Sequence, residues 1–371
     1  MQDFRTVADA LGSDLYSIRS KVEAGKRLTR EDGLLLFRPE VDFHVVGQLA
    51  DLVRRRKHGG AAYYNINAHL NPTNVCIYRC PLCAYSRDPR DAGAYVMSRD
   101  EILARGQEAV ASGATELHIV GGLHPDKDYA WYRGILDDLH TAYPSLHLKA
   151  WTPVEIAWFA ESTGRTFRDI LEDLMSVGLG SMPGGGAEIF APEIRRQIAP
   201  RKADAETWLS VHRTAHQLGL RTNATMLYGH FESAAHRVDH LLRLRSLQDE
   251  TGGFQAMIPL AFHPEGTQLA AHIPRPPTAF DDLRTVAVSR LLLDNFDHVK
   301  AYWISLGVQT AQIALGYGAD DLDGTVRHEK IHHDAGSQAP EVLAVEELEA
   351  LIREAGFEPV ERDTLYRPVQ R

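Results

Sequence analysis

Three cysteines stand out, because they are the whole thiol complement of this 371-residue chain and fall in one short segment. Cys76, Cys80 and Cys83 follow the pattern C-x₃-C-x₂-C, and an odd number of cysteines excludes a fully paired disulfide framework. A structural zinc site usually takes four ligands, so His69 or His124 would have to supply the fourth. An iron–sulfur cluster normally takes four thiolates, and three would leave one iron open to a substrate. The pattern therefore favours a catalytic 4Fe–4S site over zinc or over three buried apolar thiols.

The elements that must position these cysteines alternate between strands and helices from residue 61 onward. Strand candidates are Tyr63–Leu70, Glu116–Val120, Leu146–Trp151, Ser181–Ile189, Arg221–Tyr228, Phe254–Phe262, Val299–Leu306 and Ala311–Leu315. Eight such runs separated by helices predict an α/β fold, a (β/α)₈ TIM-type barrel. We expect an N-terminal helical extension over 1–60, the barrel over 61–340, and a C-terminal helix and strand packed on it over 341–371.

Helix boundaries and several charged residues can also be predicted. Capping residues mark helix starts at Asp42, Ser98 (with Glu101), Thr166, Asp204 and Asp281 or a neighbour. Arg290 lies in the middle of a helical pattern, where we expect a structural ion pair. Asp320, Asp321 and Asp323 are expected to surround a turn after the last strand or to cap a helix.

The cysteine pattern after a first barrel strand resembles the signature of the radical S-adenosylmethionine (SAM) superfamily. The resemblance implies that the amino and carboxylate groups of SAM chelate the open iron. One electron from the cluster then cleaves the sulfonium and yields a 5′-deoxyadenosyl radical. Gly121-Gly122, which ends the second strand candidate, matches the place where the family turns backbone groups toward the methionine amino group. Glu188 matches an acid that hydrogen-bonds the ribose hydroxyls, whereas Leu82 stands where the family usually has an aromatic residue.

A narrower resemblance covers nearly the whole chain, from about residue 20 to its end. Its motifs are His69-Leu-Asn-Pro-Thr-Asn-Val-Cys76, Gly121-Gly-Leu-His-Pro125, Pro183-Gly-Gly-Gly-Ala-Glu-Ile-Phe190, Asn223-Ala-Thr-Met-Leu-Tyr-Gly-His230, Pro259-Leu-Ala-Phe-His-Pro264 and Gly318-Ala-Asp-Asp-Leu-Asp-Gly-Thr325. Together and in this order they are similar to the aminofutalosine synthases of the futalosine route to menaquinone. Individually they are shared with relatives such as the dehypoxanthine futalosine cyclase and the tyrosine-using enzyme of deazaflavin biosynthesis.

This resemblance implies a reaction in which SAM is a co-substrate. The adenosyl radical would add to the vinyl carbon of 3-[(1-carboxyvinyl)oxy]benzoate instead of abstracting hydrogen. The new radical would attack the aromatic ring, the ether C–O bond would migrate, and carbon dioxide would leave as bicarbonate. The products would be 6-amino-6-deoxyfutalosine and methionine. A reductant such as flavodoxin or ferredoxin would supply the electron.

Polar residues that follow strand candidates are the expected site residues, because a barrel places its site at the carboxyl ends of its strands. We expect His230 and His263 to contact the substrate carboxylates and His124 to lie at the cofactor, since imidazole can act as a donor or a cation. Thr152 and Glu155 follow the third strand candidate and are expected to reach the cofactor. For each histidine, a capping or core role stays open.

The composition of the chain argues against nucleic-acid binding and against insertion into a membrane. The formal charge is −10, from 40 basic and 50 acidic residues, which argues against nucleic-acid binding. No apolar run is long enough to cross a membrane, and the N-terminal residues lack signal-peptide features. We therefore expect a cytoplasmic enzyme without a membrane partner. The alternatives are a hydrogen-abstracting radical SAM enzyme, such as the cyclase, and a non-catalytic metal-binding protein.

Overall fold

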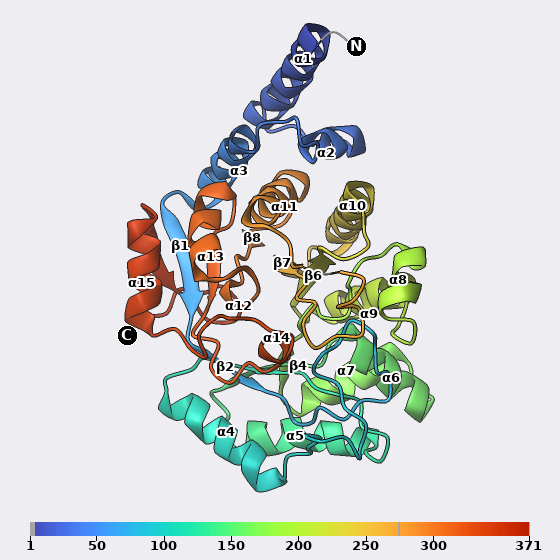
Figure 1. Cartoon of the computed structure of the whole chain (residues 1–371). Helices are drawn as coiled ribbons and strands as arrows, with labels where there is room; N and C mark the ends of the chain where they lie inside the picture. The colour runs from blue at the N-terminus through green and yellow to red at the C-terminus, as the bar shows by residue number, and fades with distance from the viewer. Residues whose placement is uncertain (1–3, 274, 371) are drawn as a thin grey trace.

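The computed structural model describes residues 4–273 and 275–370, and its strands form a parallel barrel (Figure 1). The strands are β1 (Ala61–Asn65), β2 (Asn67–Leu70), β3 (Glu116–Ile119), β4 (His147–Ala150), β5 (Leu179–Ser181), β6 (Thr222–Tyr228), β7 (Phe254–Ala261), β8 (His298–Val299) and β9 (Asp321–Gly324). β1 and β2 follow each other directly and together make the first barrel strand. Single bridges, Met182 to Thr222 and Lys300 to Asp321, join β5 to β6 and β8 to β9. Because β9 also pairs with β1, the ring closes and the expected (β/α)₈ barrel is confirmed.

Helices surround the barrel (Figure 1). Those that follow the strands are α4 (Arg99–Ala111), α5 (Tyr129–Ala142), α6 (Pro153–Thr163), α7 (Phe167–Ser176), α8 (Pro192–Ile198), α9 (Ala205–Gln217), α10 (Ala234–Thr251), α11 (Ala279–Leu292), α12 (Trp303–Leu306), α13 (Val308–Ala314), the 3₁₀ turn η1 (Leu315–Tyr317) and α14 (Ile331–Asp334). The caps predicted at Ser98, Thr166 and Asp204 are confirmed. α11 is capped by Thr278, three residues before Asp281.

The two ends of the chain add to one side of the barrel. Before β1 come α1 (Phe4–Glu23), α2 (Arg30–Leu36) and α3 (Phe43–His58), and α1 projects away from the body in Figure 1. After β9 come α15 (Val345–Glu354) and β10 (Glu358–Glu361), which pairs in parallel with β1. The division of the chain at residues 60 and 340 stays a prediction. Within residues 4–273 and 275–370, no helix has both the length and the apolar character needed to cross a membrane.

Three predicted strands are wrong. Of Ser181–Ile189 only Ser181 belongs to a strand, the end of β5, and the rest is loop before α8. Residues Val299–Leu306 hold only the end of β8 before α12, and Ala311–Leu315 lies in α13 and η1. In α13 the buried Ala311 and Ala314 lie three residues apart, whereas Ile313 is exposed, which is a helical and not an alternating pattern. The eighth strand is β9, whose sequence Asp-Leu-Asp-Gly has low strand propensity.

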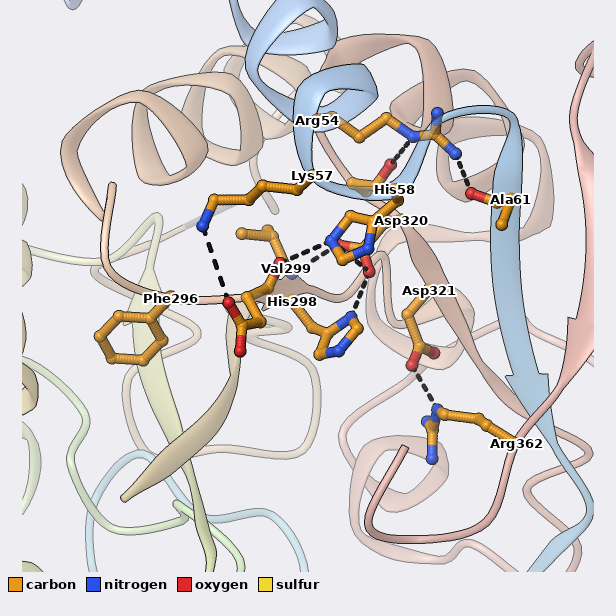
Figure 2. A network of polar contacts seen from close by, with 12 residues as sticks. Arg54, Lys57, His58, Ala61, Phe296, His298, Val299, Asp320, Asp321 and Arg362 are labelled. Carbon is orange, nitrogen blue, oxygen red and sulfur yellow. Dashed lines mark hydrogen bonds and ion pairs between the residues drawn. The ribbon is translucent and has the colours of Figure 1, made fainter. Parts of the chain in front are cut away.

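Three aspartates, at positions 320, 321 and 323, explain why so polar a segment can complete the barrel. Asp320, just before β9, accepts hydrogen bonds from His298 Nδ1 and from the backbone N–H of Val299 (Figure 2). It also accepts one from Arg290 Nη2. Burial alone would raise the pKa of Asp320, but His298 and Arg290 hold it well below its usual range. The ion pair expected for Arg290 is confirmed, and both side chains are fully buried.

The other two aspartates are paired in the same way. Arg362, from the C-terminal segment, donates from Nε to Asp321 Oδ2 at 2.6 Å (Figure 2), and Lys300 donates to Asp323. These carboxylates lie inside the barrel wall, so the expected turn or helix caps are wrong. Buried ion pairs have overridden local propensity here, since a carboxylate in an apolar interior needs a partner.

Removal of one partner tests this view of barrel closure. We predict that Arg290→Met lowers the free energy of unfolding by about 3 kcal/mol, because it leaves the Asp320 carboxylate buried without its cation. Thermal and urea denaturation of the apoprotein would measure the change. Arg19→Met, which breaks an exposed ion pair with Glu23, is the control and should have little effect. Equal stability of the two variants would contradict the assignment, and adding Asp320→Asn to Arg290→Met should recover part of the loss.

Candidate active site

A cavity of about 300 Å³ lies inside the barrel at the carboxyl ends of the strands. All three cysteines line it, on the loop that follows β2. Backbone hydrogen bonds hold this loop against the next barrel unit, from Ile77 N–H to the Leu123 carbonyl at 2.9 Å and from Gly122 N–H to the Thr73 carbonyl at 2.8 Å.

The donor set of the cavity bears on which metal group it fits. Cys76, Cys80 and Cys83 are the only thiols among the described residues, and His124, one of the two candidates for a fourth zinc ligand, does not line the cavity. A tetrahedral structural zinc site usually takes four protein ligands. An iron–sulfur cluster is held by thiolates, and three of them would leave one iron open, so the three thiols fit such a cluster. Burial raises the pKa of Cys80 to about 11, so its proton must leave as metal binds.

Gly121 and Gly122 bring the end of β3 against the cysteine loop. A Cβ at Gly122 would lie 2.1 Å from the Val75 carbonyl oxygen, and one at Gly121 would lie 3.0 Å from the Thr73 carbonyl oxygen. No other residue fits so close to a neighbouring backbone. Both glycines line the cavity that the cysteines also line, and their contact with the cofactor stays a prediction.

Thr152 and Glu155 form a capping box at the start of α6 and also line the cavity. The Glu155 carboxylate accepts the Thr152 N–H at 3.0 Å and the backbone N–H of Gly121. Burial raises the pKa of Glu155 above its ordinary value. This carboxylate therefore holds the glycine pair against α6. Glu155 also lies in the cavity wall, so it has a structural role at the edge of the ligand space.

Glu188 lies in the cavity wall with backbone φ of +47°, held there by a hydrogen bond from Leu227 N–H to its carbonyl at 2.8 Å. Its carboxylate accepts from Lys202 Nζ, a partner that the sequence pattern did not indicate. Burial would lower the pKa of Lys202, but Glu188 and Cys80 raise it. The ammonium group is therefore a permanent cation in the same cavity as the thiols.

The three predicted histidines have different surroundings. His263 lines the cavity, and its Nε2 lies 2.8 Å from the Ser305 carbonyl oxygen. His230 and His124 are not among the cavity-lining residues. His230 is enclosed, with Nδ1 3.0 Å from Glu232 Oε2 and Nε2 3.0 Å from the Leu227 carbonyl oxygen. His124 Nδ1 accepts the Asp126 N–H at 3.0 Å, so that nitrogen stabilises a loop.

The floor of the cavity carries polar residues, namely His69, His118, Lys149, Lys300 and Asp323. Among them only His69 was proposed from the sequence as a possible ligand, for zinc. His118 and Lys149 lie in predicted strands that are mostly apolar, and a lysine there was a signal, because lysine is rarely buried.

Comparisons with known proteins agree with this architecture. Residues 70–244 match the family described as the radical SAM superfamily, and residues 251–371 match the CofH/MqnC C-terminal region. The chain is 47% identical to the aminodeoxyfutalosine synthase of Thermus thermophilus, over 96% of each chain, and 46% identical to that of Streptomyces coelicolor, over 94% of this chain and 92% of the relative. It is 40% identical to the 5-amino-6-(D-ribitylamino)uracil–L-tyrosine 4-hydroxyphenyl transferase of Methanopyrus kandleri, over 89% and 90%.

Solved structures share the fold at lower identity. Methylornithine synthase superposes with a TM-score of 0.74 at 16% identity, covering 92% of this chain and 97% of that one. The FeFe-hydrogenase maturase HydG from Carboxydothermus hydrogenoformans gives a TM-score of 0.74 at 16% identity, covering 98% and 83%.

The cysteines can be tested one at a time. We predict that Cys76→Ala, Cys80→Ala and Cys83→Ala each abolish cluster assembly and leave a folded barrel, because the loop lies outside the strands. Iron and sulfide content after anaerobic reconstitution, with circular dichroism for the fold, would measure this. Asp88→Ala, an exposed change on the same loop, should keep the cluster. Normal turnover by any cysteine variant would contradict the cluster assignment.

Glu188 can be tested through SAM binding. We predict that Glu188→Gln weakens SAM affinity about fivefold, or about 1 kcal/mol, because the amide cannot make charge-assisted bonds to hydroxyls. Calorimetry on the reconstituted protein would measure the affinity, and the iron content should not change. Glu193→Gln, on the exposed side of α8, is the matched control. Unchanged SAM affinity in Glu188→Gln would show that Glu188 does not bind the cofactor and serves only as the ion-pair partner of Lys202.

Proposed function

The chain belongs to the radical SAM superfamily, within the family that holds aminodeoxyfutalosine synthase, and we propose that it is itself such a synthase. It would join the 5′-deoxyadenosyl group of SAM to 3-[(1-carboxyvinyl)oxy]benzoate and form 6-amino-6-deoxyfutalosine for menaquinone biosynthesis. The observation that carries the proposal is similarity along nearly the full length of two synthases. The single cavity that contains both the cysteines and a polar floor supports it.

The cysteines fit a 4Fe–4S cluster that would be held by Cys76, Cys80 and Cys83. Such a cluster, bound by three thiolates, supplies an open iron for the amino and carboxylate groups of SAM and the electron that releases the adenosyl radical. Gly121 and Gly122 let the end of β3 pack directly against the cysteine loop, so their backbone groups would lie beside the methionine end of SAM. Glu188 would accept hydrogen bonds from the ribose hydroxyls, with Lys202 keeping it ionised.

Much of the cavity lining is apolar, which suits a reactive carbon radical. It includes Leu82, Leu123, Val154, Leu227 and Ile258. A primary carbon radical reacts with whatever it meets, so the site must hold the vinyl carbon close and keep water out. His263 also lines the cavity, fixed by the Ser305 carbonyl, where it can orient the substrate.

An acidic electron carrier such as flavodoxin or ferredoxin suits the outer side of the cysteine loop. Arg201 is exposed and donates from Nη1 to the Ile77 carbonyl at 3.1 Å, so it places a cation directly beside the loop. Arg79, on the loop itself, is partly exposed. Opposite charge favours the encounter of electron-transfer partners.

A hydrogen-abstracting reaction is the second candidate. Residues 251–371 match a region described for CofH and MqnC, and relatives with a different activity reach 40% identity. Such an enzyme would leave the adenosyl carbons in 5′-deoxyadenosine or in regenerated SAM, without an adduct to the substrate.

Labelled SAM separates the two candidates. With SAM carrying ¹³C in the ribose, the enol-ether benzoate and a chemical reductant, we predict label in a nucleoside product that also contains the aromatic ring. Methionine should form in equal amount, because each adduct consumes one SAM. Anaerobic reaction followed by mass spectrometry would measure both. Label found wholly in 5′-deoxyadenosine, with substrate consumed, would overturn the synthase proposal in favour of hydrogen abstraction.

A further inference from the structure

The floor of the cavity is a layer of polar side chains on neighbouring strands, here called the floor layer and made of His69, His118, Lys149, Lys300 and Asp323. Strand register builds it, because His69 on β2 is opposite His118 on β3, and His118 is opposite Lys149 on β4. Residues opposite each other on adjacent parallel strands point to the same face, which here is the barrel interior.

The histidines of this layer are neutral and offer donors. Burial lowers the pKa of His118 well below its usual value, with the nearby His69 and Lys149 adding to the effect. Burial likewise lowers the pKa of His69. The two rings lie 4.6 Å apart, and His69 Nε2 is buried without a hydrogen-bond partner within the described residues. A buried polar atom left without a partner is costly, so a ligand that completes it is favoured.

The lysines of this layer are buried cations with hydrogen-bonding capacity left over. Lys149 is 3% exposed and donates to Glu116 Oε1 at 2.6 Å, and Lys300 is 1% exposed and donates to Asp323. Each ammonium has three N–H groups, so donors remain beyond these bonds. Glu116 does not line the cavity. Two ammonium groups and the Asp323 carboxylate therefore face the ligand space at the floor, and the buried Glu329 carboxylate lines the same cavity near His69.

We propose that the floor layer is the subsite for the aromatic carboxylate of the substrate, with Lys149 and His118 as the residues that bind it and set specificity. The inference rests on the proposed function and adds which residues bind which end of the substrate. A carboxylate offers only acceptors, which complements the N–H donors that the two lysines and two imidazoles bring to a layer whose own carboxylate, Asp323, is already paired with Lys300. Hydrogen bonds from a cation to a carboxylate are also among the stronger ones available in a protein.

The length of the substrate gives its direction in the cavity. The vinyl carbon must meet the adenosyl group, which is held at the cysteine end. Of the two carboxylates, the aromatic one lies farther from the vinyl carbon, so it points to the floor while the ring lies between the apolar walls. Lys149 and Lys300 are already paired with Glu116 and Asp323, so the carboxylate would use the N–H groups that these bonds leave free.

Equilibrium binding tests the subsite without requiring turnover. The protein would be reconstituted with its cluster, saturated with SAM and kept without reductant. Calorimetry would compare 3-[(1-carboxyvinyl)oxy]benzoate with the matching benzamide, in which only the aromatic carboxylate is neutralised. We expect the parent protein to bind the benzoate at least tenfold more tightly than the benzamide, and Lys149→Met to lose most of this preference, with SAM affinity and iron content unchanged.

Two further variants make the result decisive. Lys149→Met combined with Glu116→Gln removes both charges of the buried pair and should lose the preference while staying folded, even if the single variant unfolds. Lys57→Met, a half-buried lysine on α3 outside the cavity, should keep the preference. A parent protein that binds both ligands equally, or a folded double variant that keeps the tenfold preference, would overturn the subsite.

The same preparations separate this inference from the proposed function. Addition of reductant to the parent protein with the benzoate reports whether an adenosyl adduct forms. If the adduct forms and the double variant keeps its benzoate preference, the subsite is wrong and the synthase reaction stands. If the preference depends on Lys149 and no adduct forms, the subsite stands and the synthase reaction is wrong.

Discussion

The rest of the structure depends on how the barrel closes between its eighth and first strands. β9 is short and contains two aspartates, Asp321 and Asp323, and a third, Asp320, lies directly before it. Each buried carboxylate needs a cation, and the three cations come from α11, from the C-terminal segment and from the end of β8. This requirement explains why the C-terminal segment returns to the barrel and why Lys300 faces the interior. The charge pairing of one strand thus fixes both the closure and one side of the cavity floor.

A closed barrel gives the chain one interior with two chemically different ends. The end at the loops holds the three thiols, the glycine pair and the Glu188–Lys202 ion pair, all of which suit a cofactor with charged groups. The other end holds two lysines and two neutral histidines, and much of the remaining lining is apolar. Radical addition needs such an arrangement, because polar anchors hold the reactants at their far ends while the reacting carbons meet away from water.

Much of this could be predicted from the sequence, because its signals were local. The C-x₃-C-x₂-C pattern, the glycines at 121 and 122 and the helix caps depend on residues close together in the chain. The eighth strand could not be found in this way, since β9 exists through ion pairs with Arg290 and Arg362, which are distant in sequence. The pairing of Lys202 with Glu188 was missed for a similar reason, because Lys202 lies in an ordinary polar loop after α8.

The central claim is that one barrel cavity holds SAM at the three cysteines and the enol-ether benzoate between SAM and the floor. An anaerobic crystal structure of the reconstituted protein with SAM and this substrate would test it most directly. The account predicts a 4Fe–4S cluster on Cys76, Cys80 and Cys83, the vinyl carbon next to the adenosyl 5′-carbon, and the aromatic carboxylate against Lys149 and His118. A cluster with other protein ligands, or a substrate bound outside the barrel, would contradict it.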